Sequence, residues 1–401
     1  MTVDLTTPVA HVIASDAEAI DVATELASRL AGGAASRDAE RRLPFDELAE
    51  IRRAGLLAIT VPRAYGGAEV SAVTLAEVIR LLAAADPNIA QIPQSHFVYL
   101  EGLRLNGTAA QQELLFGEVL RGAQIANAQT ERGTKTIRDL QTRVVRRPGG
   151  GFALDGTKYY ATGSLFADWL AVQALDEAGL LQVAYVRADA PGVDIVDDWN
   201  GMGQRTTASG TVRFDRVPVD EGLLVAQHQT YDRPQVYGAR AQLLHAAIDA
   251  GIAAGALAEA VAFVREKSRP WFEAGVDQAA DDPLTIQRFG ELTVTLRAAE
   301  ALLGAAARAV DEAGDPPTEA SAADASLAVA TAKVAADRAA NEISSALFEV
   351  AGTRASLDEL NLHRHWRNAR THTLHDPVRW KVQHLGRHTL NGTPPPRHGV
   401  L

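Results

Sequence analysis

RPGGGFALDGTKYY, residues Arg147–Tyr160, is the stretch that rules out an all-helical chain. A proline and three glycines are typical of a tight turn, and Phe152 and Leu154 then alternate with smaller or polar residues, as in a β-strand. Asp155-Gly156 is a second turn signal. The stretch therefore predicts a β-hairpin near the middle of the sequence, with Asp155-Gly156 as one of its turns.

Further strand-like runs follow this hairpin. LAVQAL (170–175) and LQVAYV (181–186) are short apolar runs, and RFDRVPVD (213–220) alternates polar and apolar residues. The spacing of these runs is too short for helices of ordinary length. We therefore predict a compact β domain over residues 123–230.

Helical periodicity governs both sides of this β domain. Residues 1–122 contain several amphipathic segments, which predict an N-terminal helical domain. Four long amphipathic segments come later, near 239–267, 284–313 and 320–350 and from about residue 357 onward. Four such helices favour a bundle, so residues 231–401 are predicted to form a C-terminal four-helix bundle with a tail. The predicted fold class is mainly α with a central β domain.

Composition narrows the classes of function. The net charge of −11 opposes a general nucleic-acid partner, which needs a basic surface. Cysteine is absent, which excludes disulfides, thiolate catalysis and cysteine-ligated metal centres. No charge-free apolar run reaches the length of a membrane span, and the first residues lack the basic and apolar regions of a signal peptide. We expect a cytoplasmic chain that neither binds nucleic acid nor crosses a membrane.

The most unusual stretch is RHWRNARTHTLHDPVRWK, residues 364–381, in which a single acid, Asp376, stands among histidines, arginines and tryptophans. His372 and His375 are three residues apart, a spacing that places them on one helical face. A metal site is disfavoured because Asp376 is the only carboxylate nearby. The remaining interpretations are a helix whose charges cover a surface, and a segment that takes part in catalysis or binds a phosphate.

The order of helical domain, β domain and helical bundle resembles the acyl-CoA dehydrogenase superfamily, from about Leu43 onward. GTKYYATGS (156–164) is similar to that superfamily's flavin-lining signature, which implies a middle β-barrel domain with Tyr160 and Thr162 beside the isoalloxazine. A hydroxyl there can hydrogen-bond the ring and tune its chemistry. NAQTERGTKT (127–136) resembles the loop that brings Asn127 and Thr130 to the flavin.

Two further cofactor-binding residues follow from the same resemblance. Trp199, in DDWNGMGQRTTASGTVRF (197–214), matches a residue that stacks against the flavin ring. Arg269, in REKSRPW, matches an arginine that binds a flavin phosphate, usually from a neighbouring subunit, and a guanidinium suits phosphate geometry. The resemblance also implies a homotetramer.

The sequence departs from the dehydrogenases in two places. Phe348 stands where they carry a glutamine, and Ala351 replaces the first of two glycines that hold the adenine half of FAD, which favours FMN. Asp376 falls at the position of their catalytic glutamate and is followed by Pro377 in place of glycine. A general base must come within hydrogen-bond reach of its proton, so a shorter carboxylate before a rigid proline argues against thioester dehydrogenation.

RNARTHTLHDPV (367–378) instead resembles the flavin-monooxygenase branch of the superfamily. In that branch, reduced FMN arrives from a separate NAD(P)H:FMN reductase, reacts with O2 to give a C4a-(hydro)peroxide and transfers one oxygen atom to the substrate. The resemblance implies that His375 is the main catalytic residue, because histidine titrates in a suitable range for proton donation. His96, in PQSHFVYL, and Asn127 are the further catalytic candidates, and His372 is expected behind His375.

The predicted function is therefore a two-component, FMN-dependent monooxygenase that acts on a small, organosulfur substrate. Two alternatives remain. One is an FAD-dependent acyl-CoA dehydrogenase with Asp376 or Glu349 as its base, and the other is a flavin-binding or scaffold protein without turnover. Arg367 and Arg370 are expected to support the site or to bind its phosphate.

Overall fold

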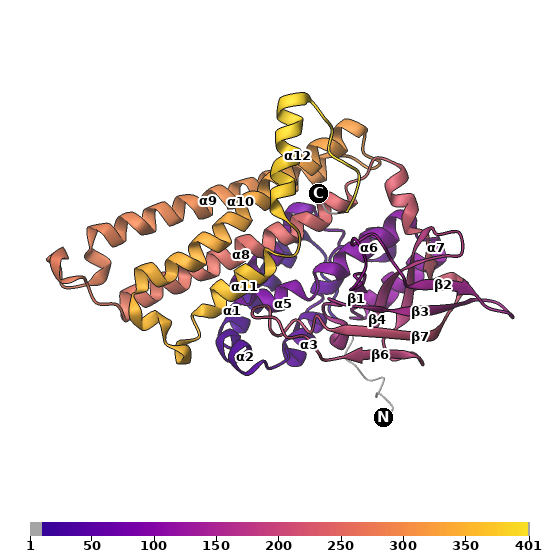
Figure 1. Cartoon of the computed structure of the whole chain (residues 1–401), viewed down its shortest axis with the longest axis horizontal. Coiled ribbons are helices and arrows are strands. Elements are labelled where there is room, and N and C mark those ends of the chain that lie inside the picture. Colours follow the sequence, from indigo (N-terminus) through magenta and orange to yellow (C-terminus); the bar gives the residue numbers. More distant parts are fainter. Residues whose placement is uncertain (1–9, 400–401) are drawn as a thin grey trace.

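The computed structural model describes residues 10–399 and has three parts. In Figure 1 the long C-terminal helices extend to one side, the sheet lies on the other, and the N-terminal helices lie between them. The predicted fold class, mainly α with a central β domain, is confirmed. The expectation that no signal peptide opens the chain concerns in part residues 1–9, which lie outside the described range, and the domain boundaries at 122 and 230 stay predictions.

The N-terminal helices pack directly onto the C-terminal bundle. Helix α4 (Ala72–Ala85) begins at the N-cap Ser71, and one hydrophobic core joins it to the long helix α8 (Tyr237–Glu266). Helix α5 (Pro87–Gln91) follows at once, because the Asp86 side chain accepts a hydrogen bond from the Asn88 N–H and caps it. The other helices here are α1 (Asp16–Ala31), α2 (Ala34–Glu40), α3 (Phe45–Arg53), α6 (Gln94–Asn106) and α7 (Ala109–Leu120).

The described strands form one eight-stranded sheet. The order is β6-β7-β3-β2-β4-β5-β8, and β1 pairs in parallel with β4. Among these strands, no pairing joins β6 to β8 to close the sheet into the expected barrel. The strands are β1 (Ile125–Ala128), β2 (Arg143–Arg146), β3 (Phe152–Lys158), β4 (Trp169–Leu175), β5 (Leu181–Arg187), β6 (Val193–Val196), β7 (Thr211–Val219) and β8 (Leu224–Val225).

The hairpin of β2 and β3 is confirmed, but only one of its two predicted turns exists. The glycine-rich turn is closed by the Arg147 N–H, which donates to the Gly151 carbonyl oxygen at 3.0 Å. Asp155 and Gly156 lie inside β3, at a bulge opposite β7, so the prediction of a turn there was wrong. A Cβ atom on Gly156 would lie 2.3 Å from Thr142 Oγ1, so the glycine permits a close approach and does not make a turn.

The C-terminal part contains three of the four predicted long helices as expected. These are α8, α9 (Pro283–Glu312) and α10 (Glu319–Ala351). The fourth is not one helix: short turns lead into α11 (His363–His372), and the chain then breaks before α12 (Val378–Asn391). Pro377 accounts for the break, because it disfavours helical backbone at the residue before it and lacks an N–H donor. The break places His375 and Asp376 outside regular structure.

Helix α8 is the centre of this bundle. By length and composition it is the one described helix that could cross a membrane. Most of its side chains are buried against neighbouring helices, which is typical of the core helix of a globular domain. Its first half carries His245 and Asp249, both buried.

Candidate active site

His375 is the exposed member of a histidine cluster. Its side chain is accessible to solvent, and its ring stacks on His245 of α8 with centroids 3.9 Å apart and planes tilted by 33°. The surrounding protein lowers the pKa of His375 to about 4, chiefly by burial, against the pull of Asp376. Because the residue is exposed, we expect a shift of this size only when a ligand covers the ring. With a ligand bound, His375 is therefore neutral at pH 7 and able to accept a proton.

His372 lies behind His375 and is fully engaged. Its Nδ1 is 2.5 Å from Asp249 Oδ1, and its Nε2 is 3.2 Å from His245 Nδ1 and 3.1 Å from Gln91 Oε1. The structure thus brings His372 and His375 together with His245, as the spacing of the first two suggested. Among residues 10–399, no group of three or more potential ligands is arranged to hold a metal ion.

Asp376, which stands at the position of a dehydrogenase base, is held in a buried ion pair. Its Oδ2 lies 2.6 Å from Lys381 Nζ. Burial alone would raise the pKa of Asp376, but Lys381 and Lys333 hold it below the usual range. The alternative base, Glu349, is exposed on α10 and pairs with Arg288 at 3.2 Å. Asp376 Oδ1 has no hydrogen-bond partner among the described residues, but the ion pair and the lowered pKa make this carboxylate a weak base, and Glu349 is engaged at the surface.

A second group of predicted residues gathers around the end of β3. Tyr160 is left-handed at φ 55° and 47% exposed, and its ring lies edge-on to Trp199 with centroids 6.2 Å apart. A non-glycine residue in this conformation is uncommon and is often found at functional sites. Asn127 Nδ2 reaches the Tyr160 carbonyl oxygen at 3.4 Å. Thr162 Oγ1 lies 2.7 Å from Ser209 Oγ.

Thr130 joins the same region through its backbone, because the Tyr159 N–H donates to the Thr130 carbonyl oxygen at 2.8 Å. Several buried polar atoms nearby have no hydrogen-bond partner among the described residues. They are Asn127 Oδ1, both side-chain heteroatoms of Gln204, Arg205 Nε and Thr206 Oγ1. Buried polar atoms are usually paired, so this concentration is expected where a polar ligand binds.

The loop between β6 and β7 connects the residues around the end of β3 with the helices that carry the histidine cluster. The Gln204 N–H donates to Asn368 Oδ1 on α11 at 2.7 Å, and the Thr206 N–H donates to Asn88 Oδ1 on α5 at 3.2 Å. Gly203 lies so close to α11 that a Cβ would be 2.0 Å from the Arg367 carbonyl oxygen. Because α5 carries Gln91 and α11 carries His372, the loop and the histidine cluster are held by the same two helices.

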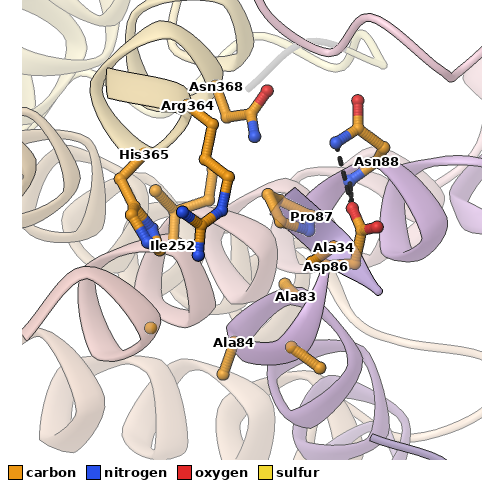
Figure 2. A pocket seen from close by; sticks show the side chains of 12 residues that line it. Ala34, Ala83, Ala84, Asp86, Pro87, Asn88, Ile252, Arg364, His365 and Asn368 are labelled. Atoms are coloured by element: carbon orange, nitrogen blue, oxygen red, sulfur yellow. Dashed lines mark hydrogen bonds between the residues drawn. The ribbon is translucent and has the colours of Figure 1, made fainter. Parts of the chain in front are cut away.

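Figure 2 shows a small cavity beneath α11, lined by Arg364, His365 and Asn368 on one side and by Asp86 and Asn88 on the other. Its volume of about 10 Å³ suits no more than one water molecule. A cavity of about 210 Å³ lies elsewhere, next to Glu101, Arg104 and Arg240. Neither is lined by a predicted site residue.

Three predicted residues lie outside both groups. His96 on α6 is fully buried, accepts from the Ile125 N–H at 3.0 Å through Nδ1 and lies 2.8 Å from the Leu57 carbonyl oxygen through Nε2. Both ring nitrogens are therefore used by the backbone, so the structure adds no support for a catalytic role. Arg370 reaches Asn341 Oδ1 at 3.4 Å, next to the histidine cluster. Arg269 is exposed beyond the end of α8.

The sequence predictions did not include four residues of the histidine cluster. His245 and Asp249 are four residues apart on α8, and Lys333 and Lys381 belong to α10 and α12. A signal existed for two of them: Asp249 and Lys333 are isolated charges within alanine-rich helical stretches. A lone charge on a helix that is otherwise apolar is expected to pair with an opposite charge inside the protein.

Comparison with known proteins agrees with this architecture. The chain matches three profiles of Acyl-CoA dehydrogenase: the N-terminal domain over residues 18–123, the middle domain over 126–217 and the C-terminal domain over 243–380. Dibenzothiophene monooxygenase from Rhodococcus erythropolis is 33% identical over 398 residues, which cover 95% of each chain. The probable FMNH2-dependent monooxygenase SfnC of Pseudomonas putida is 34% identical, over 94% of this chain and 96% of SfnC.

The three-dimensional fold of this chain is also similar to that of a solved structure. FMN-bound TdsC from Paenibacillus sp. A11-2 superimposes with a TM-score of 0.91 at 32% identity, over 96% of this chain and 100% of TdsC. Sequence and fold therefore agree over nearly the full length. The chain belongs to the acyl-CoA dehydrogenase superfamily and, within it, to the family of flavin-dependent monooxygenases that includes dibenzothiophene monooxygenase.

Proposed function

We propose that this chain is a two-component monooxygenase that uses reduced FMN and O2 to transfer one oxygen atom to a small organosulfur compound. The observation that carries the proposal is the break between α11 and α12. Asp376, at the position of a dehydrogenase base, is tied to Lys381, while the neighbouring His375 is exposed and backed by buried histidines. A site built in this way offers only a weakly basic carboxylate to remove a proton from a thioester but presents an imidazole to a ligand.

FMN fits the group of residues around the end of β3. Tyr160 and Trp199 offer aromatic surfaces, and Thr162 offers a hydroxyl. Asn127 Oδ1 is a buried acceptor that lacks a partner among the described residues, and a flavin ring offers a donor for it. Reduced FMN bound there would supply the electrons that activate O2, and one atom of that O2 would be transferred to the substrate.

This chain's own residues then have three tasks. Asn127, Thr162 and Trp199 orient the flavin. His375 accepts a proton at its ring or returns one, since a bound ligand that covers the ring keeps its pKa low and the imidazole neutral at pH 7. The buried His245 and His372 fix the orientation of that ring and limit the water around it, which protects an oxygen-reactive site from side reactions.

FMN is proposed over FAD for a reason that lies on α10. Phe348, at the position of the adenine-binding glutamine, packs partly buried against a cluster that includes Phe263 and Leu347. An apolar side chain engaged in this way offers no hydrogen bond to an adenine. We also propose that the enzyme is a homotetramer in which Arg269, exposed beyond α8, reaches the flavin phosphate of a neighbouring subunit.

The experiment combines the purified chain with an independent NAD(P)H:FMN reductase, NADH, FMN and air. A thiophene, a sulfoxide and a sulfone serve as substrates, and products are identified by mass spectrometry. We expect at least one product that carries one additional oxygen atom, formed only when the reductase, FMN and the chain are all present. Reduction of an electron acceptor by acyl-CoA thioesters, with no oxygenated product, would contradict the proposal and support the dehydrogenase.

The cofactor is tested separately by titrating the chain with FMN and with FAD. We expect FMN to bind more tightly, and Phe348→Gln to improve FAD binding without a comparable change for FMN. An exposed substitution on the same helix, Glu349→Gln, is the matched control. Tighter binding of FAD than of FMN by the wild type would contradict the proposed cofactor. It would leave the proposal of an oxygenation reaction unaffected.

A further inference from the structure

A fully buried ion pair lies behind the histidine cluster and has no role in the chemistry described above. Asp249 on α8 and Lys333 on α10 are both 0% exposed, and Asp249 Oδ2 lies 2.5 Å from Lys333 Nζ. Removing two charges from water costs several kcal/mol per ion, and apolar residues of similar size are often at least as stabilising. Stability alone therefore does not explain why an alanine-rich helix core contains this pair.

The second oxygen of Asp249 contacts the histidine cluster. Asp249 Oδ1 is 2.5 Å from His372 Nδ1, and a carboxylate can only accept there, so Nδ1 carries the proton. The other nitrogen, Nε2, faces both His245 Nδ1 at 3.2 Å and Gln91 Oε1 at 3.1 Å. A neutral His372 accepts at Nε2 from the His245 N–H. A protonated His372 donates from Nε2 to the Gln91 oxygen, so the surroundings satisfy both protonation states.

We propose that Asp249 and Lys333 are positioning residues that set the protonation of the His372–His245 couple on which His375 rests. Asp249 accepts from the His372 Nδ1–H, and its negative charge favours a second proton on Nε2. Lys333 offsets enough of that charge that the second proton can still leave. The second proton of a protonated His372 then passes from Nε2 to an unprotonated His245 Nδ1 along their 3.2 Å contact, and the resulting His245 N–H returns it to the neutral His372. A role of this couple in oxygenation rests on the proposed function. The effect of Asp249 and Lys333 on the protonation of His372 does not depend on that function.

Other charged groups face the couple from each element packed around it. Asp337 on α10, Arg370 on α11 and the Asp376–Lys381 pair lie nearby, and Asp337 and Asp376 oppose the field of Lys333. Burial lowers the pKa of His245 well below its usual value, and the neighbouring His375, His372, Lys333 and Lys381 add to this effect. His245 therefore carries the additional proton only transiently.

Opposite substitutions give opposite predictions. Lys333→Met removes the offsetting cation, so Asp249 holds the His372 proton to a higher pH. Asp249→Asn removes the anion and leaves Lys333 to repel a proton, so His372 loses it at a lower pH. An opposite charge within about 4–6 Å moves such a midpoint by roughly 1–3 pH units, so we expect shifts of at least about one unit in each direction. A purely structural pair would lose stability in both variants without opposite shifts.

The readout is 15N NMR of the flavin-free protein labelled with [15N]histidine, which reports the tautomer and charge of each ring as pH changes. His372→Gln identifies the His372 signals among the 11 histidines. Arg37→Met is the matched control, because Arg37 and Asp86 form another buried pair at 3.0 Å. That control is expected to lose comparable stability and to leave the His372 midpoint unchanged.

The double variant Asp249→Asn/Lys333→Met keeps the proposal testable if a single variant does not fold. Its midpoint is expected to differ from the wild type, with the proton no longer fixed on Nδ1. Shifts in the same direction for both single variants, or a wild-type midpoint and tautomer in the double variant, would overturn the proposal. If the midpoints shift as expected and no substrate is oxygenated, the proposed function fails and this inference stands.

Discussion

Acidification should destabilise this protein partly because His96 is buried. The substitution His96→Gln should remove that part of the pH dependence. His96 is 0% exposed, and its pKa is lowered from 6.5 to about 4, chiefly by burial. Between pH 6.5 and 4, His96 therefore binds a proton in the unfolded chain but stays neutral in the folded chain. The contribution to stability is complete above pH 6.5 and is lost as the pH falls towards 4.

The size of the effect follows from the shift. A difference of two and a half units corresponds to about 3 kcal/mol of unfolding free energy at pH 4 and below. With about 2 cal/mol/K of unfolding entropy per residue, a chain of 401 residues would lose about 4 °C in Tm through this histidine alone. In His96→Gln this part of the pH dependence is absent.

The assay is the Tm of the wild type and of His96→Gln, measured by calorimetry at intervals between pH 7.5 and 4. His96→Gln is expected to be less stable at pH 7.5, because the Leu57 carbonyl oxygen and the Ile125 N–H lose their ring partner. The gap should narrow by about 4 °C at low pH. His388→Gln, at an exposed histidine, is the control and should follow the wild type. Parallel curves for the wild type and His96→Gln would refute the reasoning.

Three further predictions concern the site. His375→Ala should lower oxygenation roughly 100-fold or more while FMN still binds, and unchanged turnover in a rapid-mixing assay would remove His375 from the mechanism. Asn127→Ala should weaken FMN binding by roughly tenfold in a fluorescence titration, since it deletes a buried hydrogen-bonding group; equal affinity would show that Asn127 does not contact the flavin. Gly203→Ala should cost roughly 1–3 kcal/mol of stability, because its Cβ would lie 2.0 Å from a carbonyl oxygen of α11; wild-type Tm would show that the loop yields.

The sequence predicted the elements that depend on local pattern. The strands that correspond to LAVQAL, LQVAYV and RFDRVPVD lie where alternation placed them, and α8, α9 and α10 follow the helical period. Two errors among these local elements arose because the same residue type can serve different structural purposes. Gly156 permits a close approach to Thr142 rather than a turn, and Pro377 divides what the period suggested was one helix.

The site was predictable only where its residues lie close together in the sequence. His372 and His375 were visible because they lie three residues apart in an unusual stretch. Asp249 is 123 residues from His372 and 84 from Lys333, so no local pattern connects the three. Their relation depends on how α8, α10 and α11 pack, which single-sequence reasoning does not supply. His96 was predicted from a local motif, but both of its ring nitrogens form hydrogen bonds with backbone groups, which the motif did not indicate.

Labelling with 18O2 tests the central claim most directly. The chain is mixed with FMN reductase, NADH, FMN and an organosulfur substrate under 18O2, and the product is analysed by mass spectrometry. We predict one 18O atom per product molecule, one NADH consumed per product in a fully coupled reaction, and loss of labelled product in His375→Ala. Product oxygen that comes from water, or NADH consumption that yields only hydrogen peroxide with every substrate tested, would contradict the account.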